Sequence, residues 1–109
     1  MTSNRDTDPE SAYNEVAEHL EAKDPSVQRG KMFGMPTIKA GGKAIAGLHG
    51  DDMVFKLPDE KERERALEIE GAHLFEPMEG RAMKEWVQVP REQFELWKGL
   101  AELALAARA

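Results

Sequence analysis

The chain has 109 residues, no cysteine and a net charge of -6, a combination that fits a single domain and excludes a disulfide framework and thiolate chemistry. The acidic balance argues against a general nucleic-acid binder, which needs clustered Lys and Arg to neutralise phosphates. The start of the chain is polar and no stretch approaches the ~18 apolar residues of a membrane span, so we expect no membrane association and a cytoplasmic protein.

The first element that the sequence predicts is a helix beginning after Asp8. Residues 1–7 are polar and are expected to be disordered, with residues 8–109 forming one domain. Asp8 suits a helix cap and Pro9 the first helical position, whereas Asp24-Pro25 disfavours continuation of the helix. Apolar side chains recur at helical spacing, at Tyr13, Val16, Ala17 and Leu20. The pattern predicts an amphipathic helix.

Extended structure is predicted between Lys31 and Leu57, after a turn-like stretch at residues 26–30. We expect one or two short strands, followed by a three-stranded meander. Its two-residue turns are predicted at Gly41-Gly42 and at Gly50-Asp51, because these residues suit the tight turns of hairpins.

The turns also predict which residues of the meander face each other. The first turn places Ile38 opposite Ile45, and the second places Ala46 opposite Phe55. One face of the meander is then wholly apolar and suited to a packed helix, with Ala44, Ala46, Leu48, Met53, Phe55 and Leu57. The other face is mixed, with Ile38, Ile45 and Val54 beside Lys43 and Lys56. This mixed face is either half exposed or covered by a second element.

The rest of the chain predicts a helix, a loop and a strand. Asp59 caps a mostly charged helix that runs to about Glu70 and lies on the rim of the core. The segment with Pro77 and Gly80 is predicted to be a loop, and residues 85–89 a strand.

A final helix is predicted to begin at Pro90. Leu96 and Leu103 widen its apolar stripe enough to pack against both the sheet and the first helix. The element order predicts an α+β fold, with a largely antiparallel sheet and the N- and C-terminal helices on one face.

Several short motifs follow one another in an order that resembles a known family. These are Met32-Phe33-Gly34, the Gly41-Gly42 hairpin, Met53-Val54-Phe55-Lys56 and Trp86-Val87-Gln88-Val89-Pro90. Together they resemble TfoX N-terminal-like domains over roughly residues 27–106, and YjbR-like proteins share a similar Gly-Gly-Lys hairpin. The resemblance implies a sheet-and-helix fold related to secretion-chaperone-like architectures, and it implies a regulatory role.

One stretch of the chain is basic although the whole is acidic. From Pro25 to Gly50 there is no Asp or Glu, while Arg29, Lys31, Lys39 and Lys43 are all cationic. Lysines around a glycine hairpin can bind an anion, but solvated lysines on strand edges have the same pattern. The spacing lacks the helix and the Lys-Ser/Thr of a P-loop.

His49 and Asp51 are the residues that suggest catalysis or metal binding. His49-Gly50-Asp51-Asp52 places an imidazole beside two carboxylates, and the same residues also suit a turn. The other histidines are scattered, so no metal site and no cofactor is predicted.

Two hypotheses of function follow from these patterns. The first is a non-enzymatic regulatory or protein-interaction module that binds a protein partner or itself, through an exposed surface at Ile38, Ile45 and Val54 or through a sheet edge. The second is a domain that binds a small ligand or an anion through Arg29, Lys31, Lys39, Lys43 and His49, with a minor enzymatic variant centred on His49 and Asp51.

Overall fold

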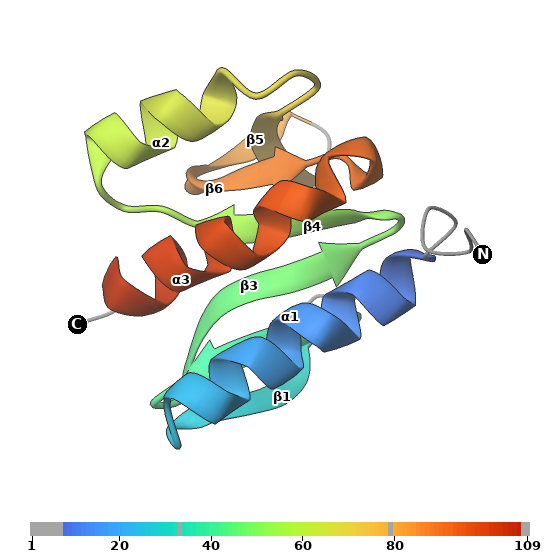
Figure 1. The fold of residues 1–109 in the computed structure, drawn as a ribbon. Helices are drawn as coiled ribbons and strands as arrows, with labels where there is room; N and C mark the ends of the chain where they lie inside the picture. Colours follow the sequence, from blue (N-terminus) through green and yellow to red (C-terminus); the bar gives the residue numbers. More distant parts are fainter. Residues whose placement is uncertain (1–7, 33, 79, 108–109) are drawn as a thin grey trace.

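The computed structural model describes residues 8–32, 34–78 and 80–107. The predicted disorder of residues 1–7 lies outside the described part of the chain. The elements, drawn in Figure 1, are α1 (Pro9–Lys23), β1 (Val27–Met32), β2 (Met35–Ala40), β3 (Lys43–His49), β4 (Asp52–Lys56), α2 (Glu60–Leu67), β5 (His73–Met78), β6 (Arg81–Val89), the 3-10 helix η2 (Arg91–Leu96) and α3 (Trp97–Ala107).

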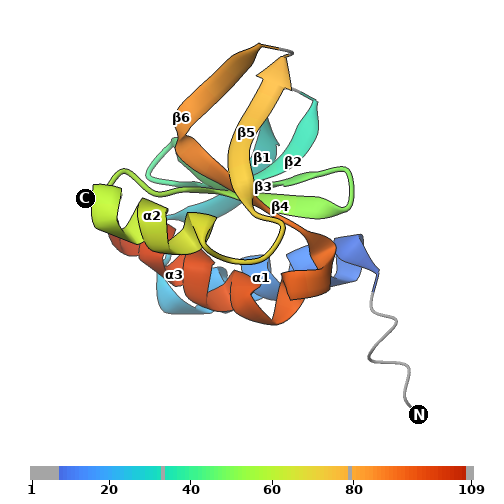
Figure 2. The ribbon, with the colours of Figure 1, turned by 90° about the horizontal axis from the view of Figure 1, so that it is seen from above.

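The described strands form one antiparallel sheet in the order β1-β2-β3-β4-β6-β5. Figures 1 and 2 show α1, α2 and α3 on the same side of this sheet. This arrangement confirms the predicted α+β fold, with its antiparallel sheet and its terminal helices on one face. Locally, the Asp8 side chain caps α1 by accepting from the Ser11 amide at 2.7 Å, and Asp59 caps α2 in the same way.

The predicted register is right in one hairpin and wrong in the other. Ala46 faces Phe55 as predicted, but Ile38 faces Ala46 and not Ile45. The pairing shifts after Ile38, so that Lys39 faces Ala44 and Ile45 is the extra residue of a bulge. The bulge places Ile45 and Ala46 in the same helix-side core, which buries an additional isoleucine.

The predicted boundaries differ from the structure in the less regular segments. β1 begins at Val27, inside the stretch predicted to be a turn, and α2 ends at Leu67. The predicted loop around Pro77 is the edge strand β5, which pairs with β6. An edge strand tolerates proline because one side of its backbone has no partner strand. Gly80 has a φ of 77°, which suits the turn between these strands.

Buried apolar side chains form a cluster on each side of the sheet. The larger cluster joins α1, α3 and the helix-facing side chains of the sheet, including Phe55 and Trp97. The smaller cluster contains Met35, Val54, Phe75 and Trp86. Figure 2 shows the β1–β2 and β5–β6 hairpins rising away from the helices, so the sheet curls over the face that carries no helix. The mixed face was predicted to be half exposed or covered by a second element. The curl covers its Val54, whereas its Ile38 and Ile45 belong to the helix-side cluster.

Candidate functional site

Arg29, the first residue of the predicted basic site, ties β1 to α1. Its Nε and Nη2 donate to the two carboxylate oxygens of Glu21 at 2.8 and 3.1 Å, and its Nη1 donates to Asn14 at 3.2 Å. The hydrogen bond from Arg29 lowers the pKa of Glu21, and the same bond raises the pKa of Arg29. The guanidinium is therefore occupied by a contact within the chain.

The remaining predicted cations are distributed over both faces of the sheet. Arg29 is opposite Ile38, and this pair faces the helices. The next pair along the two strands is Gln28 and Lys39, and because successive side chains of a strand point to opposite faces, Lys39 lies on the other face of the sheet. The Lys39 stem lies over Gly30, since a Cβ built on Gly30 would be 3.2 Å from Lys39 Cε. Lys31 is exposed on β1. The structure does not bring Arg29, Lys31 and Lys39 together at one site.

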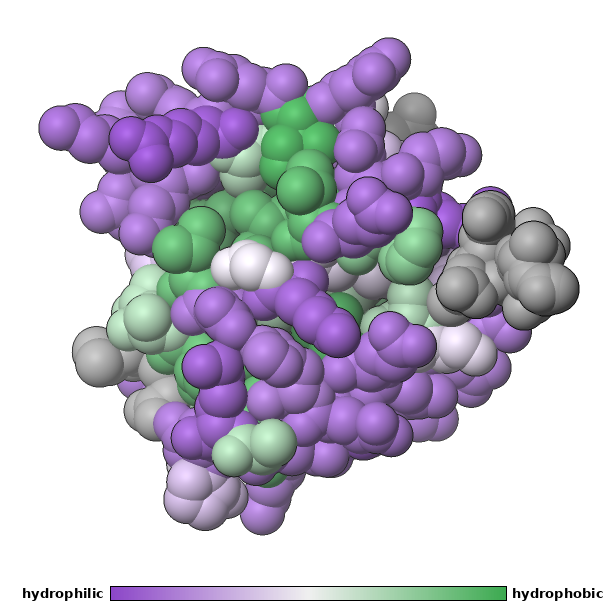
Figure 3. Space-filling model, viewed as in Figure 1, coloured by the Kyte–Doolittle hydropathy of each residue, from purple (hydrophilic) through white to green (hydrophobic). Residues whose placement is uncertain are grey.

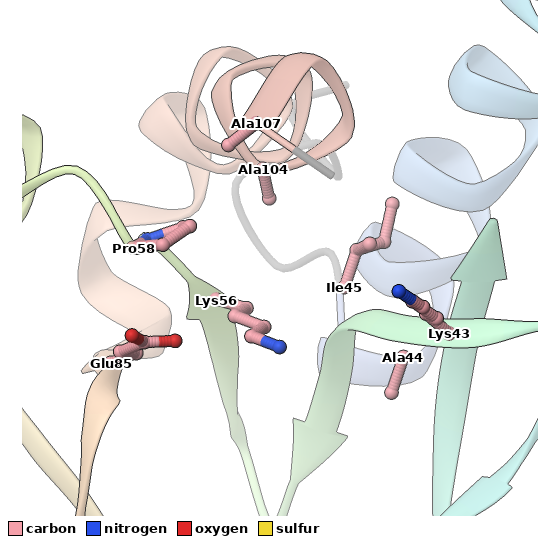
Figure 4. A pocket seen from close by; sticks show the side chains of 8 residues that line it. All are labelled: Lys43, Ala44, Ile45, Lys56, Pro58, Glu85, Ala104 and Ala107. Atoms are coloured by element: carbon pink, nitrogen blue, oxygen red, sulfur yellow. The ribbon is translucent and has the colours of Figure 1, made fainter. Parts of the chain in front are cut away.

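Lys43 lines a hollow together with another cation, Lys56, which the sequence analysis placed on the same face of the meander but not in the predicted basic site. Lys43 at the start of β3 and Lys56 at the end of β4 extend from opposite sides toward one hollow of about 130 Å³ (Figure 4). Its lining consists of Lys43, Ala44, Ile45, Lys56, Pro58, Glu85, Ala104 and Ala107. We call it the lysine hollow.

His49 and its neighbouring carboxylates are arranged as a hairpin turn. The His49 ring contacts Phe75 edge to face, with 5.0 Å between ring centroids. Asp52 accepts from Gln88 Nε2 at 2.8 Å and from the Arg91 amide at 3.1 Å, which joins β4 to η2. Across residues 8–32, 34–78 and 80–107, no three His, Cys, Asp or Glu side chains are grouped to hold a metal ion.

The predicted partner surface at Ile38, Ile45 and Val54 is wrong. The exposed fractions of these side chains are 0%, 1% and 0%. Ile38 and Ile45 are buried under the helices because of the bulge in β3, and Val54 is buried under the curl of the sheet. None of the three is available to a partner.

The exposed large apolar side chains lie instead in η2 and α3. Among the residues that the structure describes, they are Leu96, at 44% exposure, and Leu103, at 37%. The sequence predicted that both would pack against the sheet and α1. The helical stripe is wider than the surface that the sheet and α1 cover, so these side chains remain partly in solvent.

Leu103 belongs to a groove between α2 and α3. Two adjoining hollows share Glu62 and Leu103, with volumes of about 200 and 440 Å³. Figure 3 shows apolar surface between these helices, bordered by hydrophilic side chains. The lining consists of Pro58, Asp59, Glu62, Arg65, Ala66, Ile69, Leu100, Leu103, Ala106 and Ala107. We call it the α2–α3 groove.

The groove was not predicted, although its separate parts were recognised. The charged helix at residues 60–67 was expected on the rim of the core, and Ala66 is its buried residue. The excess width of the last apolar stripe, at Leu96 and Leu103, was the signal of an uncovered surface. Only the tertiary structure places Leu103 beside α2, and Leu96 lies outside the groove lining.

Comparisons with known proteins give no relative for this chain: no family model, curated protein or solved structure matches it. Within the described part of the chain, no helix has the length and apolar character needed to cross a membrane.

Proposed function

We propose that this chain is a non-enzymatic protein-interaction module that pairs reversibly with a second copy of itself through the α2–α3 groove. The observation that carries the proposal is the apolar lining of the smaller hollow of this groove, where Ala66, Ile69 and Leu100 lie beside Leu103, which is 37% exposed. Fully burying a leucine is worth about 1.5–3 kcal/mol, and because Leu103 is 37% exposed, covering it contributes roughly a third of that free energy.

The charges at the groove suit a second copy in particular. Glu62 and Arg65 lie one turn apart on α2, and both line the same hollow. In a two-fold symmetric pair, each surface meets its own equivalent, so residue i of one copy contacts residue j of the other and the reverse. Glu62 of each copy then faces Arg65 of the other around the apolar centre. Asp59 also lines the groove, so the charge complementarity between two copies depends on this one pair, Glu62 with Arg65.

The size of the face sets the expected affinity. A stable interface buries about 800 Å² on each partner, which is roughly an eighth of the 6520 Å² of exposed surface here. α3 has 11 residues and is therefore ~16 Å long, and α2 is shorter. A face of two such helices is smaller than a stable interface requires. We therefore expect a weak pair that forms and separates with concentration.

The resemblance to TfoX N-terminal-like domains supports a regulatory use of this pairing. A weak pair responds to protein concentration and can be exchanged for another partner at the same surface, which suits a regulator better than a permanent complex. None of the short motifs that carry the resemblance lies in α2, which forms one side of the groove.

Sedimentation of the full chain over a wide range of concentration tests the proposal. We expect the average mass to rise from monomer toward dimer, and Leu103→Glu to keep the chain monomeric. Lys98→Gln is the matched control, since it makes the same change in net charge on an exposed part of α3 outside the groove lining. A monomer at every concentration, or equal loss of pairing in both variants, would overturn the proposal.

A charge exchange tests the symmetric arrangement itself. Glu62→Arg or Arg65→Glu alone places like charges against each other across the two-fold axis and is expected to weaken pairing. The double variant with both changes restores opposite charges and is expected to restore pairing. Weakened pairing in the double variant would show that the copies meet in another way.

A further inference from the structure

α2 is held to the rest of the fold by a small set of contacts. It lies at the edge of the helix layer (Figure 1), six of its eight residues are charged, and Ala66 is its buried residue. Leu67 and Ile69 are partly buried and pack against the larger cluster beside it. Among the residues that the structure describes, no ion pair joins α2 to another element. A helix this short is not stable by itself in water, so α2 is helical only while these contacts hold it.

The α2–α3 groove weakens this attachment further. Its smaller hollow, of about 200 Å³, lies between α2 and the side chains of Leu100 and Leu103 on α3. Side chains that border a hollow lose the dispersion contacts that close packing would give them. α3 therefore supports α2 less than a closely packed helix would.

Arg63 fastens the beginning of α2 to the segment that follows β4. Its Nη1 donates to the carbonyl oxygens of Leu57 and Pro58, at 3.0 and 3.2 Å. The Asp59 side chain accepts from the Glu62 amide at 3.1 Å, but this bond caps the helix and does not tie it to another element. Arg63 is not part of the groove lining. Its hydrogen bonds can therefore be removed without changing the proposed interface.

These contacts set the local stability of α2. An element with few buried apolar contacts opens while the remainder of a protein stays folded. We propose that α2 undocks locally from the folded domain, losing its helix, and that pairing through the α2–α3 groove requires the docked state. The second part rests on the proposed function, because Glu62, Arg65 and Ala66 supply one side of the groove. Coupling of this kind is reciprocal, so pairing stabilises α2 by as much as the docked α2 favours pairing.

Amide hydrogen exchange of the full chain, at a concentration where sedimentation shows the monomer, tests the undocking by itself. We expect the amides of residues 63–67 to exchange at least about a hundredfold faster than those of Leu100 and Ala101 in α3, after correction for intrinsic rates. Equal protection of the two helices would overturn the proposal. This result does not depend on pairing, so it separates a failure of the undocking from a failure of the proposed function.

Exchange at concentrations where the chain pairs tests the coupling. If α2 opens only in the unpaired chain, its exchange is expected to slow by about tenfold when the free chain is at ten times the dissociation constant of the pair. Unchanged exchange of α2 in a chain that sediments as a dimer would show that α2 undocks within the pair, which would overturn the proposal.

Two arginine and lysine variants of α2 test the fastening. Arg63→Met is expected to accelerate exchange of the α2 amides about tenfold in the dilute chain, since hydrogen bonds from a charged donor are lost. Lys61→Met is the matched control, because it removes the same charge from an exposed position of the same helix outside the groove lining. Equal exchange of α2 in both variants would contradict the role of Arg63.

A variant with α2 undocked in most chains gives a readout on pairing. Leu67→Asp places a carboxylate against the larger cluster without altering the groove lining, and it changes the net charge by as much as Lys61→Met. We expect complete exchange of α2 within a chain that keeps its far-ultraviolet circular dichroism from the sheet, and pairing at least about tenfold weaker than in Lys61→Met. Undiminished pairing in Leu67→Asp with α2 fully exchanged would overturn the proposal.

Discussion

Gly47 illustrates how one missing side chain allows the curled face of the sheet to close. A Cβ built at this buried position would lie 2.8 Å from Met35 Cε and 3.1 Å from the Pro36 carbonyl oxygen. The backbone oxygen cannot move without disturbing β2. We therefore expect Gly47→Ala to lower the free energy of unfolding by about 1–3 kcal/mol, the usual cost of overpacking. Urea denaturation of both chains measures this difference.

Gly99 is the matched control for that substitution. It is exposed on α3, and a Cβ there would meet nothing within 4 Å. Gly99→Ala is expected to raise the free energy of unfolding by about 0.5–1 kcal/mol through helix propensity alone. If Gly47→Ala were as stable as Gly99→Ala, then Met35 and Pro36 would move away from the added methyl group at no cost in free energy, which would contradict the close packing at Gly47.

At the scale of elements, the ion pair of Glu21 with Arg29 fastens α1 to the first strand. Arg29 holds the pKa of Glu21 below its ordinary value of 4.5. A depressed folded-state pKa stabilises the fold above the ordinary pKa, and this stabilisation is lost as the pH falls through the folded-state pKa. Both side chains are more than a third exposed, so we expect a contribution below about 1 kcal/mol.

The acid dependence of stability isolates this contribution. We expect Glu21→Gln to lower the free energy of unfolding near neutral pH, and the difference from the unchanged chain to shrink as the pH falls below 4.5. Glu15→Gln removes a carboxylate from an exposed position of the same helix and serves as the control. A difference that stays constant with pH would contradict the assigned role of the ion pair.

The elements that sequence predicted well are those set by local chemistry. The Asp8 cap, the glycine turns and the apolar stripe of α1 each depend on a few neighbouring residues. The bulge at Ile45 and the edge strand β5 depend on which segments meet in space, and both were missed. For the same reason Lys43 was recognised as a candidate residue without its partner in the hollow, Lys56. The α2–α3 groove likewise joins two segments that are separate in the sequence.

At the scale of the whole molecule, the same strands build both clusters of the core. Val54 lies in the smaller cluster and its neighbour Phe55 in the larger one, and Trp86 and Val87 alternate in the same way on β6. Because successive side chains of a strand point to opposite faces, neither cluster can open without moving backbone that supports the other. The two sides of the sheet should therefore unfold together.

The two tryptophans allow this cooperativity to be measured, because Trp86 is in the smaller cluster and Trp97 is in the larger one. In Trp97→Phe the remaining fluorescence reports on the curled side, and in Trp86→Phe it reports on the helix side. We expect the urea midpoint from fluorescence to coincide with that from far-ultraviolet circular dichroism in each variant, as in a two-state domain. Each substitution removes a buried indole and therefore lowers the stability of its own variant. Both probes of that variant are expected to report the same lowered midpoint. An earlier fluorescence transition in Trp97→Phe alone would mean that the curled side opens while the helix layer remains folded, and the β4–β6 pairing would then not couple the two clusters.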